Sequence, residues 1–254
     1  MNTLFEVSNL KKNFGALAVT NNVSIGMAAG DRLALIGPNG AGKTTFVNLV
    51  TGHIKPDSGR VTLSGEDVTG MRPAARVQRG LIRSFQVTRL FPDMTPEEHV
   101  ALAILQRDGK AGRMSGHYSA KPAVMKEVRE TLSILGLIEL SHLKVREIAY
   151  GQQRLLEIAL AMALKPKVLL LDEPAAGVPQ LETTRIERAL DQLPKDLAIL
   201  MIDHDMDLVF RFATRVVVLA AGTVIFDGSP QAVTKDQRVR EAYLGSYANA
   251  GSAA

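Results

Sequence analysis

The segment Gly37–Thr44, which reads GPNGAGKT, constrains the fold more than any other part of the sequence. It matches the pattern G-x-x-x-x-G-K-[ST] in full, and it stands between an expected buried strand, Arg32–Ile36, and a helix expected to end near Gly52. Its glycines allow successive backbone N–H groups to wrap a phosphate, and the helix adds its positive end. An ordinary Gly-rich turn is the weaker interpretation, because Gly, Lys and Thr all stand in register.

The loop predicts a site for a nucleoside triphosphate. We expect Lys43 to reach the β- and γ-phosphates and the Thr44 hydroxyl to ligate Mg²⁺. The residues expected to contact the nucleotide here are Gly37, Pro38, Asn39, Gly40, Ala41, Gly42, Lys43, Thr44 and Thr45.

Two adjacent acids, Asp172 and Glu173, follow the apolar run Val168–Leu171. Mg²⁺ prefers oxygen ligands, so Asp172 at a strand end would suit a metal bound beside a phosphate loop. Glu173 is then placed to polarise an attacking water. A plain strand end with two solvated acids is the alternative, and the phosphate loop makes it the weaker one.

The rest of the chain predicts an α/β core interrupted by helices. Thr95, Pro96 and Glu98 form a helix-start signature, and a second helical pattern runs from Pro122 to Leu135. Between these helices, residues 107–121 are expected to form an exposed loop. Strand-like runs then alternate with helix-length segments, which is typical of parallel βαβ units. These runs are Val168–Leu171, Leu197–Ile202, Val216–Leu219 and Val224–Phe226.

Composition excludes several other classes. The absence of Cys excludes disulfide scaffolds, thiolate zinc sites and cysteine nucleophiles. A net charge of +4 in a chain of mixed charge disfavours a polycationic nucleic-acid binder. No apolar run approaches the ~20 residues of a spanning helix, and the N-terminus lacks the order of a signal peptide. We therefore expect a chain that serves a membrane, if at all, from its surface.

Further motifs make the sequence resemble the nucleotide-binding subunits of ATP-binding cassette (ABC) transporters. The segment Ile148–Arg154, IAYGQQR, matches the signature motif of that family and precedes the Asp172 strand. Gln86, within RSFQ, matches its Q-loop glutamine, and His204, within MIDHDM, matches its switch histidine. Phe14 stands where the family places an aromatic ring against adenine. These motifs occur in the family's order along nearly the whole chain.

The resemblance implies a P-loop NTPase (RecA-like) α/β core with an N-terminal antiparallel β subdomain and an inserted helical subdomain. We expect one ABC ATPase domain over residues 1–254, with its core in 1–86 and 150–230, a helical insert in 87–149 and a tail in 231–254.

The resemblance also implies residue roles in ATP hydrolysis. Lys43 neutralises phosphate charge, Glu173 orients or deprotonates the water, and His204 contacts the γ-phosphate. The implied Mg²⁺ ligands and supports are Thr44, Gln86 and Asp172. The residues implied to face the nucleotide of a second cassette are Ala149, Tyr150, Gly151 and Gln152, at the start of a helix expected over Gln153–Leu164.

Three short sequence segments narrow the resemblance to the branched-chain amino-acid (Liv-type) importers. The segments Ala149–Ala159, Asp172–Gly177 and Glu241–Gly245 carry it. Such importers combine two cassettes, identical or different, with two membrane permeases and an external solute-binding protein. The implied location is peripheral, on the cytoplasmic face of the inner membrane, with no nucleic-acid partner. The implied cargo is a branched-chain amino acid or a related small organic solute.

Two positions depart from the family pattern. Ala149 replaces the signature serine, as is common in the Liv group, and Pro179 stands where the D-loop usually carries an aspartate or an Asn-Pro pair. The alternative of a regulatory cassette with weak ATP hydrolysis therefore stays open, although Glu173 argues against it.

Other P-loop classes fit less well. A soluble ABC ATPase of DNA repair or translation would need a coiled coil or two cassettes in one chain. A P-loop kinase or GTPase would need an acceptor site or a guanine motif. As a further hypothesis, Val87–Pro92 docks the transporter's cytoplasmic loop; a buried linker is the equal alternative.

Overall fold

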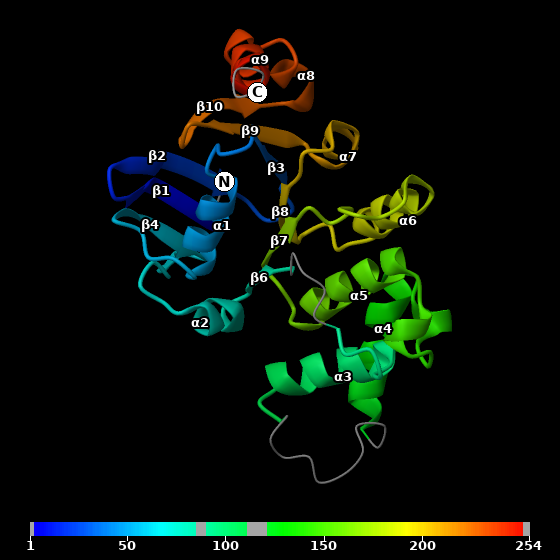
Figure 1. Ribbon diagram of the computed structural model, residues 1–254. Coiled ribbons are helices and arrows are strands. Elements are labelled where there is room, and N and C mark those ends of the chain that lie inside the picture. The colour runs from blue at the N-terminus through cyan, green and yellow to red at the C-terminus, as the bar shows by residue number, and fades with distance from the viewer. Residues whose placement is uncertain (1–2, 85–89, 111–120, 251–254) are drawn as a thin grey trace.

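The computed structural model describes residues 3–84, 90–110 and 121–250. Two sheets and a layer of helices build it (Figure 1). The first sheet is antiparallel, with strand order β2-β1-β4-β5. Its strands are β1 (Phe5–Phe14), β2 (Leu17–Met27), β4 (Ser58–Leu63) and β5 (Glu66–Asp67).

The second sheet forms the centre of the molecule, in the order β10-β9-β3-β8-β7-β6. Its neighbours run parallel except β10, which pairs antiparallel to β9 at the edge. The expectation of parallel βαβ units therefore fails for this last strand, because a short turn at residues 221–222 leaves no crossover helix. The strands are β3 (Arg32–Ile36), β6 (Leu81–Arg83), β7 (Val168–Asp172), β8 (Ala198–Ile202), β9 (Arg215–Ala220) and β10 (Thr223–Gly228).

Helices cover the central sheet and extend beyond it. Figure 1 shows α3, α4 and α5 as a separate layer at the bottom, and α7, α8 and α9 near β9 and β10 at the top. The helices are α1 (Lys43–Thr51), α2 (Pro73–Gln78), α3 (Pro96–Arg107), α4 (Pro122–Ile134), α5 (Tyr150–Ala163), α6 (Gln180–Asp191), α7 (Met206–Phe212), α8 (Pro230–Val233) and α9 (Gln237–Ala250), with 3₁₀ turns η2 (Ile138–Leu140) and η3 (Val145–Glu147).

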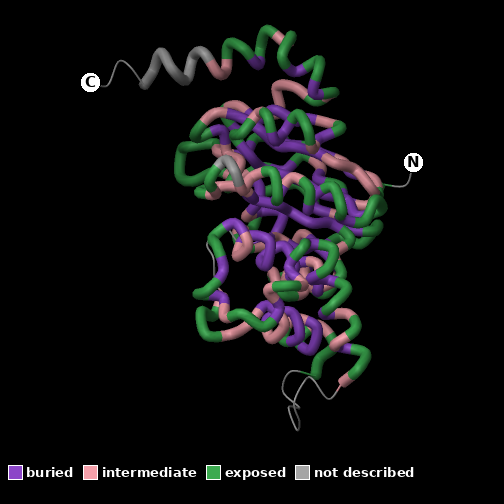
Figure 2. Tube along the Cα trace, turned by 90° about the vertical axis from the view of Figure 1, so that its right-hand side faces the viewer, coloured by how far each residue is buried: buried purple, intermediate pink, exposed green. Residues whose placement is uncertain are grey.

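Alternation along β7 shows how the core is divided. Val168 and Leu170 belong to a cluster shared with α1 and the antiparallel sheet, whereas Leu169 and Leu171 belong to the cluster formed with α3–α6. Successive side chains of a strand point to opposite faces, so an entirely apolar strand is required where both faces are covered. Buried residues accordingly concentrate on the central strands in Figure 2.

Helix-start chemistry fixes the edges of two helices in the lower layer. The Thr95 hydroxyl accepts the N–H of Glu98, and the Glu98 carboxylate accepts the N–H of Thr95, which confirms the predicted capping box. The helix predicted to begin at Gln153 instead begins at Tyr150, because the Gln152 side chain accepts the N–H of Ala149 at 2.9 Å and completes an earlier first turn.

Among the described residues, none of the helices is long and apolar enough to cross a membrane.

Candidate functional site

The phosphate loop leaves β3 and enters α1 through positions that only glycine fits. A Cβ on Gly37 would lie 2.1 Å from the Leu219 carbonyl oxygen, and one on Gly42 would lie 2.5 Å from the Val19 carbonyl oxygen. Gly42 also has φ +100° as it caps α1, a conformation that L-side chains rarely adopt. The loop is therefore tightly held between β9, at Leu219, and β2, at Val19.

Lys43 turns back onto this loop. Its ammonium donates to the carbonyl oxygens of Gly37 at 2.6 Å and Pro38 at 3.1 Å. Burial lowers the pKa of Lys43, while the carboxylates of Glu173 and Asp172 act in the opposite direction. The ammonium thus lies in a partly desolvated place near two acids, where a phosphate would be a strong electrostatic partner.

The other predicted loop residues differ in exposure. Asn39, Gly40 and Thr44 are exposed, Pro38 and Thr45 are half-buried, and Ala41 is buried. Thr44 is an exposed residue at the start of α1, a position that a ligand to a bound ion could occupy.

Asp172 ends β7 as a buried carboxylate held by an arginine. Its Oδ2 accepts from the Arg83 guanidinium at 2.5 Å, and the same guanidinium donates to Asn48 Oδ1 at 3.0 Å. Asn48 belongs to α1, so Arg83 joins the carboxylate to the helix that follows the phosphate loop. A buried carboxylate needs such a charged partner when no cation is present.

Glu173 and His204 meet at the same edge of the central sheet. Glu173 has φ +49°, and its N–H donates to the Ile202 carbonyl oxygen at 2.8 Å, which joins the ends of β7 and β8. His204 Nδ1 lies 3.5 Å from Glu173 Oε1. A non-glycine residue in this strained region is typical of a functional position.

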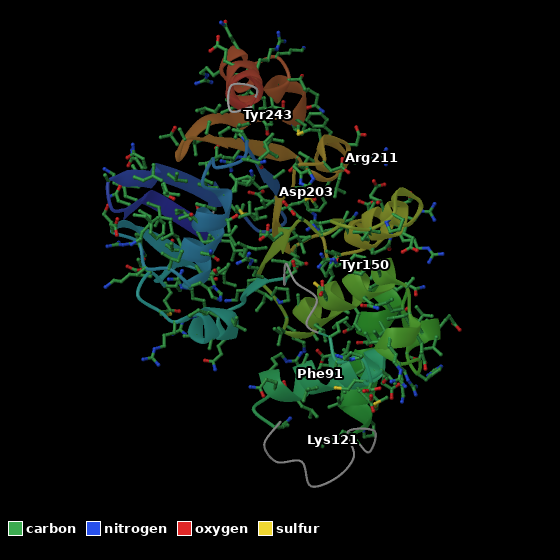
Figure 3. The ribbon with its side chains drawn as sticks, in the orientation of Figure 1. Phe91, Lys121, Tyr150, Asp203, Arg211 and Tyr243 are labelled. Carbon is green, nitrogen blue, oxygen red and sulfur yellow. The ribbon has the colours of Figure 1, made fainter. Side chains whose placement is uncertain are left out.

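Asp203, labelled in Figure 3, shapes the turn that carries His204. Its Oδ1 accepts the N–H groups of His204 at 2.7 Å and Asp205 at 2.9 Å. Burial raises the pKa of Asp203, and those two N–H groups act in the opposite direction.

Phe14 lies at the end of β1 with 49% of its surface exposed. It pairs with Leu17 of β2, and the same hairpin continues to Val19, whose carbonyl oxygen contacts the loop at Gly42. The hairpin that carries the exposed ring therefore passes beside the phosphate loop at Val19. Lys12 Nζ lies 5.6 Å from the ring centroid.

The signature residues lie at the start of α5 and contact the segment that follows Glu173. The N–H of Gly151 donates to Glu182 Oε2 at 3.2 Å. A Cβ on Gly177 would come within 3.4 Å of the Tyr150 ring, which is 41% exposed and is labelled in Figure 3. In this chain the positive end of α5 therefore already faces a carboxylate.

Beneath the signature residues lies a buried ion pair, Arg154 with Glu157, at 2.9 Å. Within the part of the chain that the structure describes, Arg154 Nε and Glu157 Oε1 have no hydrogen-bond partner. They line a cavity of about 10 Å³ together with Ser84 and Asp172. The first turns of α5 and the carboxyl end of β7 therefore lie on either side of this cavity.

Gln86 lies outside the described residues, as do residues 87–89 of the expected docking segment. Of the remainder, Leu90 is half-buried and Phe91 is 58% exposed. The N–H of Phe91 donates to Nε2 of the buried His99 at 2.9 Å, and His99 Nδ1 contacts the Thr95 carbonyl oxygen at 2.9 Å. These bonds fix the neutral tautomer with the proton on Nδ1.

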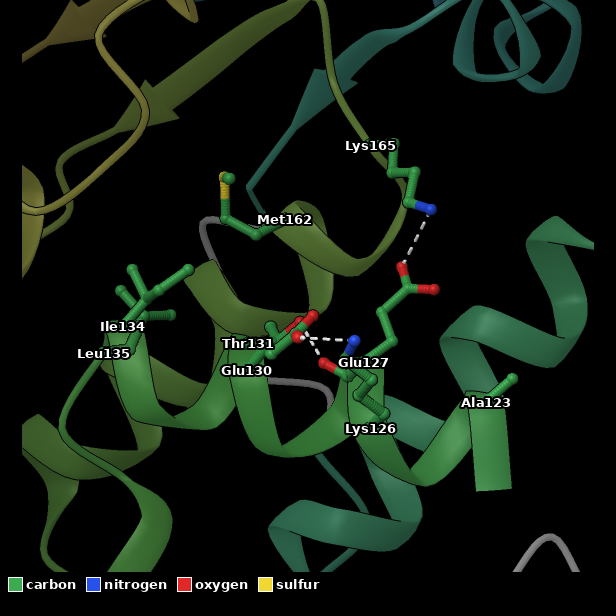
Figure 4. Close-up of a pocket in the computed structure, with 9 residues that line it drawn as sticks. All are labelled: Ala123, Lys126, Glu127, Glu130, Thr131, Ile134, Leu135, Met162 and Lys165. Atoms are coloured by element: carbon green, nitrogen blue, oxygen red, sulfur yellow. Dashed lines mark hydrogen bonds and ion pairs between the residues drawn. The ribbon is translucent and has the colours of Figure 1, made fainter. Parts of the chain in front are cut away.

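A larger cavity, of about 390 Å³, lies between α4 and the end of α5 (Figure 4). Its carboxylate Glu127 is already bonded to Arg107 and lies 3.3 Å from Lys165. Hydrogen bonds from Arg107 lower the pKa of Glu127. None of its lining residues belongs to the loop, the two acids or the histidine described above.

The carboxyl ends of β3, β7 and β8 therefore gather Lys43, Asp172, Glu173 and His204 at one edge of a parallel sheet, beside a phosphate cradle. Comparison with known proteins agrees. Residues 20–176 match the model of the ABC transporter family. The chain belongs to the ABC transporter family, as an ATP-binding cassette. As such it is an ATPase that powers transport, and the predicted P-loop fold and family are confirmed.

A second family model and several curated relatives extend this comparison. Residues 223–249 match the branched-chain amino acid ATP-binding cassette transporter model. The high-affinity branched-chain amino acid transport ATP-binding protein LivG of Salmonella typhimurium is 37% identical, over 95% of this chain and 98% of LivG. The high-affinity branched-chain amino acid transport ATP-binding protein BraF of Pseudomonas aeruginosa is 35% identical, over 95% of this chain and 98% of BraF.

Two crystal structures of ATP-binding cassettes from ABC transporters have the same fold. One, in its ADP conformation, superimposes with a TM-score of 0.83 at 29% identity, covering 96% of this chain and all of that one. The other, nucleotide-free, gives a TM-score of 0.81 at 28% identity, covering 95% and 98%.

Sequence reasoning missed three residues that shape the site: Arg83, Glu182 and Asp57. None of the three carried a usable signal in the sequence, since each reaches its partner across more than thirty residues.

Proposed function

We propose that this chain is the ATP-hydrolysing subunit of an importer for branched-chain amino acids or related small organic solutes. The observation that carries the proposal is the convergence of the phosphate loop, Asp172, Glu173 and His204 at one sheet edge. The class of cargo is supported by the match of residues 223–249 to the branched-chain family and by the names of the relatives.

Each residue at this edge has a role in phosphoryl transfer to water. The loop N–H groups and Lys43 hold and neutralise the phosphates. Glu173 would orient or deprotonate the attacking water, and His204, whose Nδ1 lies 3.5 Å from Glu173 Oε1, would bond the γ-phosphate. The adenine would stack on the exposed ring of Phe14.

Thr44, Asp172 and Gln86 would hold Mg²⁺, which screens the phosphate charge when bound. The donor set fits: one hydroxyl and one carboxylate leave room for phosphate oxygens and waters, as Mg²⁺ prefers. Until Mg²⁺ binds, the Arg83 guanidinium would balance the charge of the Asp172 carboxylate.

A second cassette, identical or different, completes the site in this proposal. Ala149, Tyr150, Gly151 and Gln152 would face its nucleotide, with the first N–H groups of α5 toward the γ-phosphate. Two membrane permeases and a solute-binding protein would complete the transporter. The chain would then sit at the cytoplasmic face of the inner membrane, with a core (1–86 and 150–230), an insert (87–149) and a tail (231–254) forming one cassette.

The replacement Glu173→Gln tests the catalytic assignment. It keeps the size of the side chain and removes the base, so we expect turnover to fall at least 100-fold while ATP still binds. Glu187→Gln, which disrupts a surface pair with Arg211, is the matched control and should keep its turnover. Hydrolysis that survives Glu173→Gln would refute the assignment.

The cargo requires a separate test on the assembled transporter. This chain would be reconstituted in vesicles with two permeases and a solute-binding protein of a branched-chain amino acid importer, and uptake of labelled leucine, isoleucine, valine, urea and phenylalanine would be compared. ATP-dependent uptake of the branched-chain substrates is expected. Uptake of none of them, with intact ATPase activity, would refute the cargo and leave the ATPase role standing.

A further inference from the structure

The residues just before Phe14 are tied to one carboxylate from another part of the chain. Asp57 Oδ1 accepts from Lys12 Nζ at 2.7 Å, and Asp57 Oδ2 accepts the N–H of Asn13 at 2.7 Å. The N–H of Asp57 in turn donates to the Lys11 carbonyl oxygen at 2.9 Å. Asp57 thus bonds three consecutive residues of β1, and the next residue is Phe14.

Lys12 carries this connection to the aromatic ring itself. Its ammonium lies 5.6 Å from the Phe14 centroid, within the range of a cation–π contact. The Lys12 side chain is only 18% exposed, whereas the ring is 49% exposed. One part of the ring is therefore covered by a fixed cation, and a large part faces solvent.

Core packing does not account for the position of this ring. Among the described residues, the hydrophobic clusters include Phe5 and Leu10 of the same strand but not Phe14. An exposed ring without core contacts would normally sample several rotamers. Here the contacts that order the ring are the hydrogen bonds of Asp57 and the ammonium of Lys12.

The cation of this ion pair is more buried than those of two nearby pairs. The Lys12 side chain is 18% exposed and Asp57 40%, whereas both side chains are at least 36% exposed in the pairs of Arg60 with Asp67 and of Arg79 with Glu66. The bonds from Lys12 and from the N–H of Asn13 lower the pKa of Asp57, so the carboxylate is charged at neutral pH.

We propose that Asp57 is a positioning residue for nucleotide recognition, which acts through Lys12 and Asn13 to hold the Phe14 ring ready for an adenine. This inference rests on the proposed function of Phe14. The ligand group concerned is the purine base, because the triphosphate is held elsewhere, by the loop at 37–45. Loss of Asp57 should therefore weaken base recognition and leave phosphate recognition intact.

The test measures binding of two ligands to the full chain, by calorimetry in the presence of Mg²⁺: ATP, and inorganic tripolyphosphate, which lacks a base. Phe14→Ala should raise the Kd for ATP at least 5-fold, the lower end of base stacking on an aromatic ring. Asp57→Asn and Lys12→Met should each raise it about 2- to 5-fold, the size of a cation–π contact and the ordering it gives. None of the three should change the Kd for tripolyphosphate.

A double replacement separates positioning from a merely structural effect. If Asp57 acts through the ring, Phe14→Ala with Asp57→Asn should bind ATP no more weakly than Phe14→Ala alone. Glu66→Gln, which disrupts the Arg79 pair in the same sheet, is the control and should bind ATP normally. Lys12→Met provides the same readout if Asp57→Asn does not fold.

The outcomes distinguish this inference from the proposed function. Additive losses, or equal weakening of ATP and tripolyphosphate by Asp57→Asn, would overturn the positioning role and leave that of Phe14 intact. If Phe14→Ala leaves the Kd for ATP unchanged, the adenine role of Phe14 fails, and the positioning role fails with it. In that event the Glu173 test still decides the ATPase assignment.

Discussion

Arg76 is a buried cation that bonds no carboxylate among the described residues, and replacing it should destabilise the protein strongly. The side chain is 1% exposed. Its guanidinium donates to the carbonyl oxygens of Leu49 at 2.9 Å and Val50 at 2.6 Å, which end α1, and to those of Thr69 at 2.7 Å and Met71 at 3.1 Å. Burial lowers the pKa of Arg76. The cation therefore caps the negative end of the helix that begins at the phosphate loop.

Arg76→Met fills much of the same volume and removes all four bonds. A bond from a charged donor contributes about 1.5 kcal/mol or more, and removing the buried charge returns part of that sum. We therefore expect the free energy of unfolding to fall by about 3–4 kcal/mol, a large share of the ~5–15 kcal/mol typical of a domain. Arg76→Lys keeps the charge but fewer donors, so about half of the loss should remain.

Urea unfolding followed by far-UV circular dichroism measures this loss, since the chain has no Trp for fluorescence. Arg79→Met is the matched control from the residue that caps α2, and loss of its surface pair with Glu66 should cost at most about 1 kcal/mol. If Arg76→Met unfolds within 1 kcal/mol of the parent chain, the capping argument is refuted.

Three further predictions concern other charged groups. Arg83→Leu leaves its buried carboxylate partner unpaired, so the ligand-free chain should lose about 2–3 kcal/mol in urea; an unchanged midpoint would contradict the ion-pair role. Glu182→Gln removes the charge that faces the N–H of Gly151 and would compete with a phosphate for it. In the Glu173→Gln background, which should not hydrolyse ATP, the Kd of the ATP-dependent dimer should therefore fall about 3- to 10-fold in analytical ultracentrifugation. An equal or weaker dimer would argue against this competition. Burial lowers the pKa of His99, so the unfolded chain binds a proton at this residue before the folded chain does, and stability should decline as pH falls below about 6.5. The His99→Gln chain should show a shallower decline of the urea midpoint between pH 7 and 5. An identical decline in both chains would show that His99 is not the cause.

Local signals predicted much of the fold because they act over a few residues. The strand Arg32–Ile36 and the following helix were expected from apolar periodicity, and the structure has both at those bounds. The capping box at Thr95 also forms as predicted. These features depend on spacing within one turn or one strand, which a single sequence displays directly.

Long-range pairing could not be read in the same way. The short strands β4, β5 and β6 lack a clear pattern, because their partners in the two sheets supply most of their stabilisation. Arg76 and Asp57 are ordinary charged residues in the sequence, and only the folded chain shows what they bond. Of the predicted site, Lys43, Asp172, Glu173 and His204 converge, whereas Gln86 lies outside the described residues and its role stays a prediction.

Lys43 closes the phosphate loop by bonding two of the loop's own carbonyl oxygens, and this has a consequence for nucleotide binding. Because Lys43 bonds the carbonyl oxygens of Gly37 and Pro38, an arriving triphosphate exchanges partners with a loop that already has its shape. Binding then requires little ordering of the chain, so its entropy loss should be small and its rate set mainly by diffusion and by release of one ammonium.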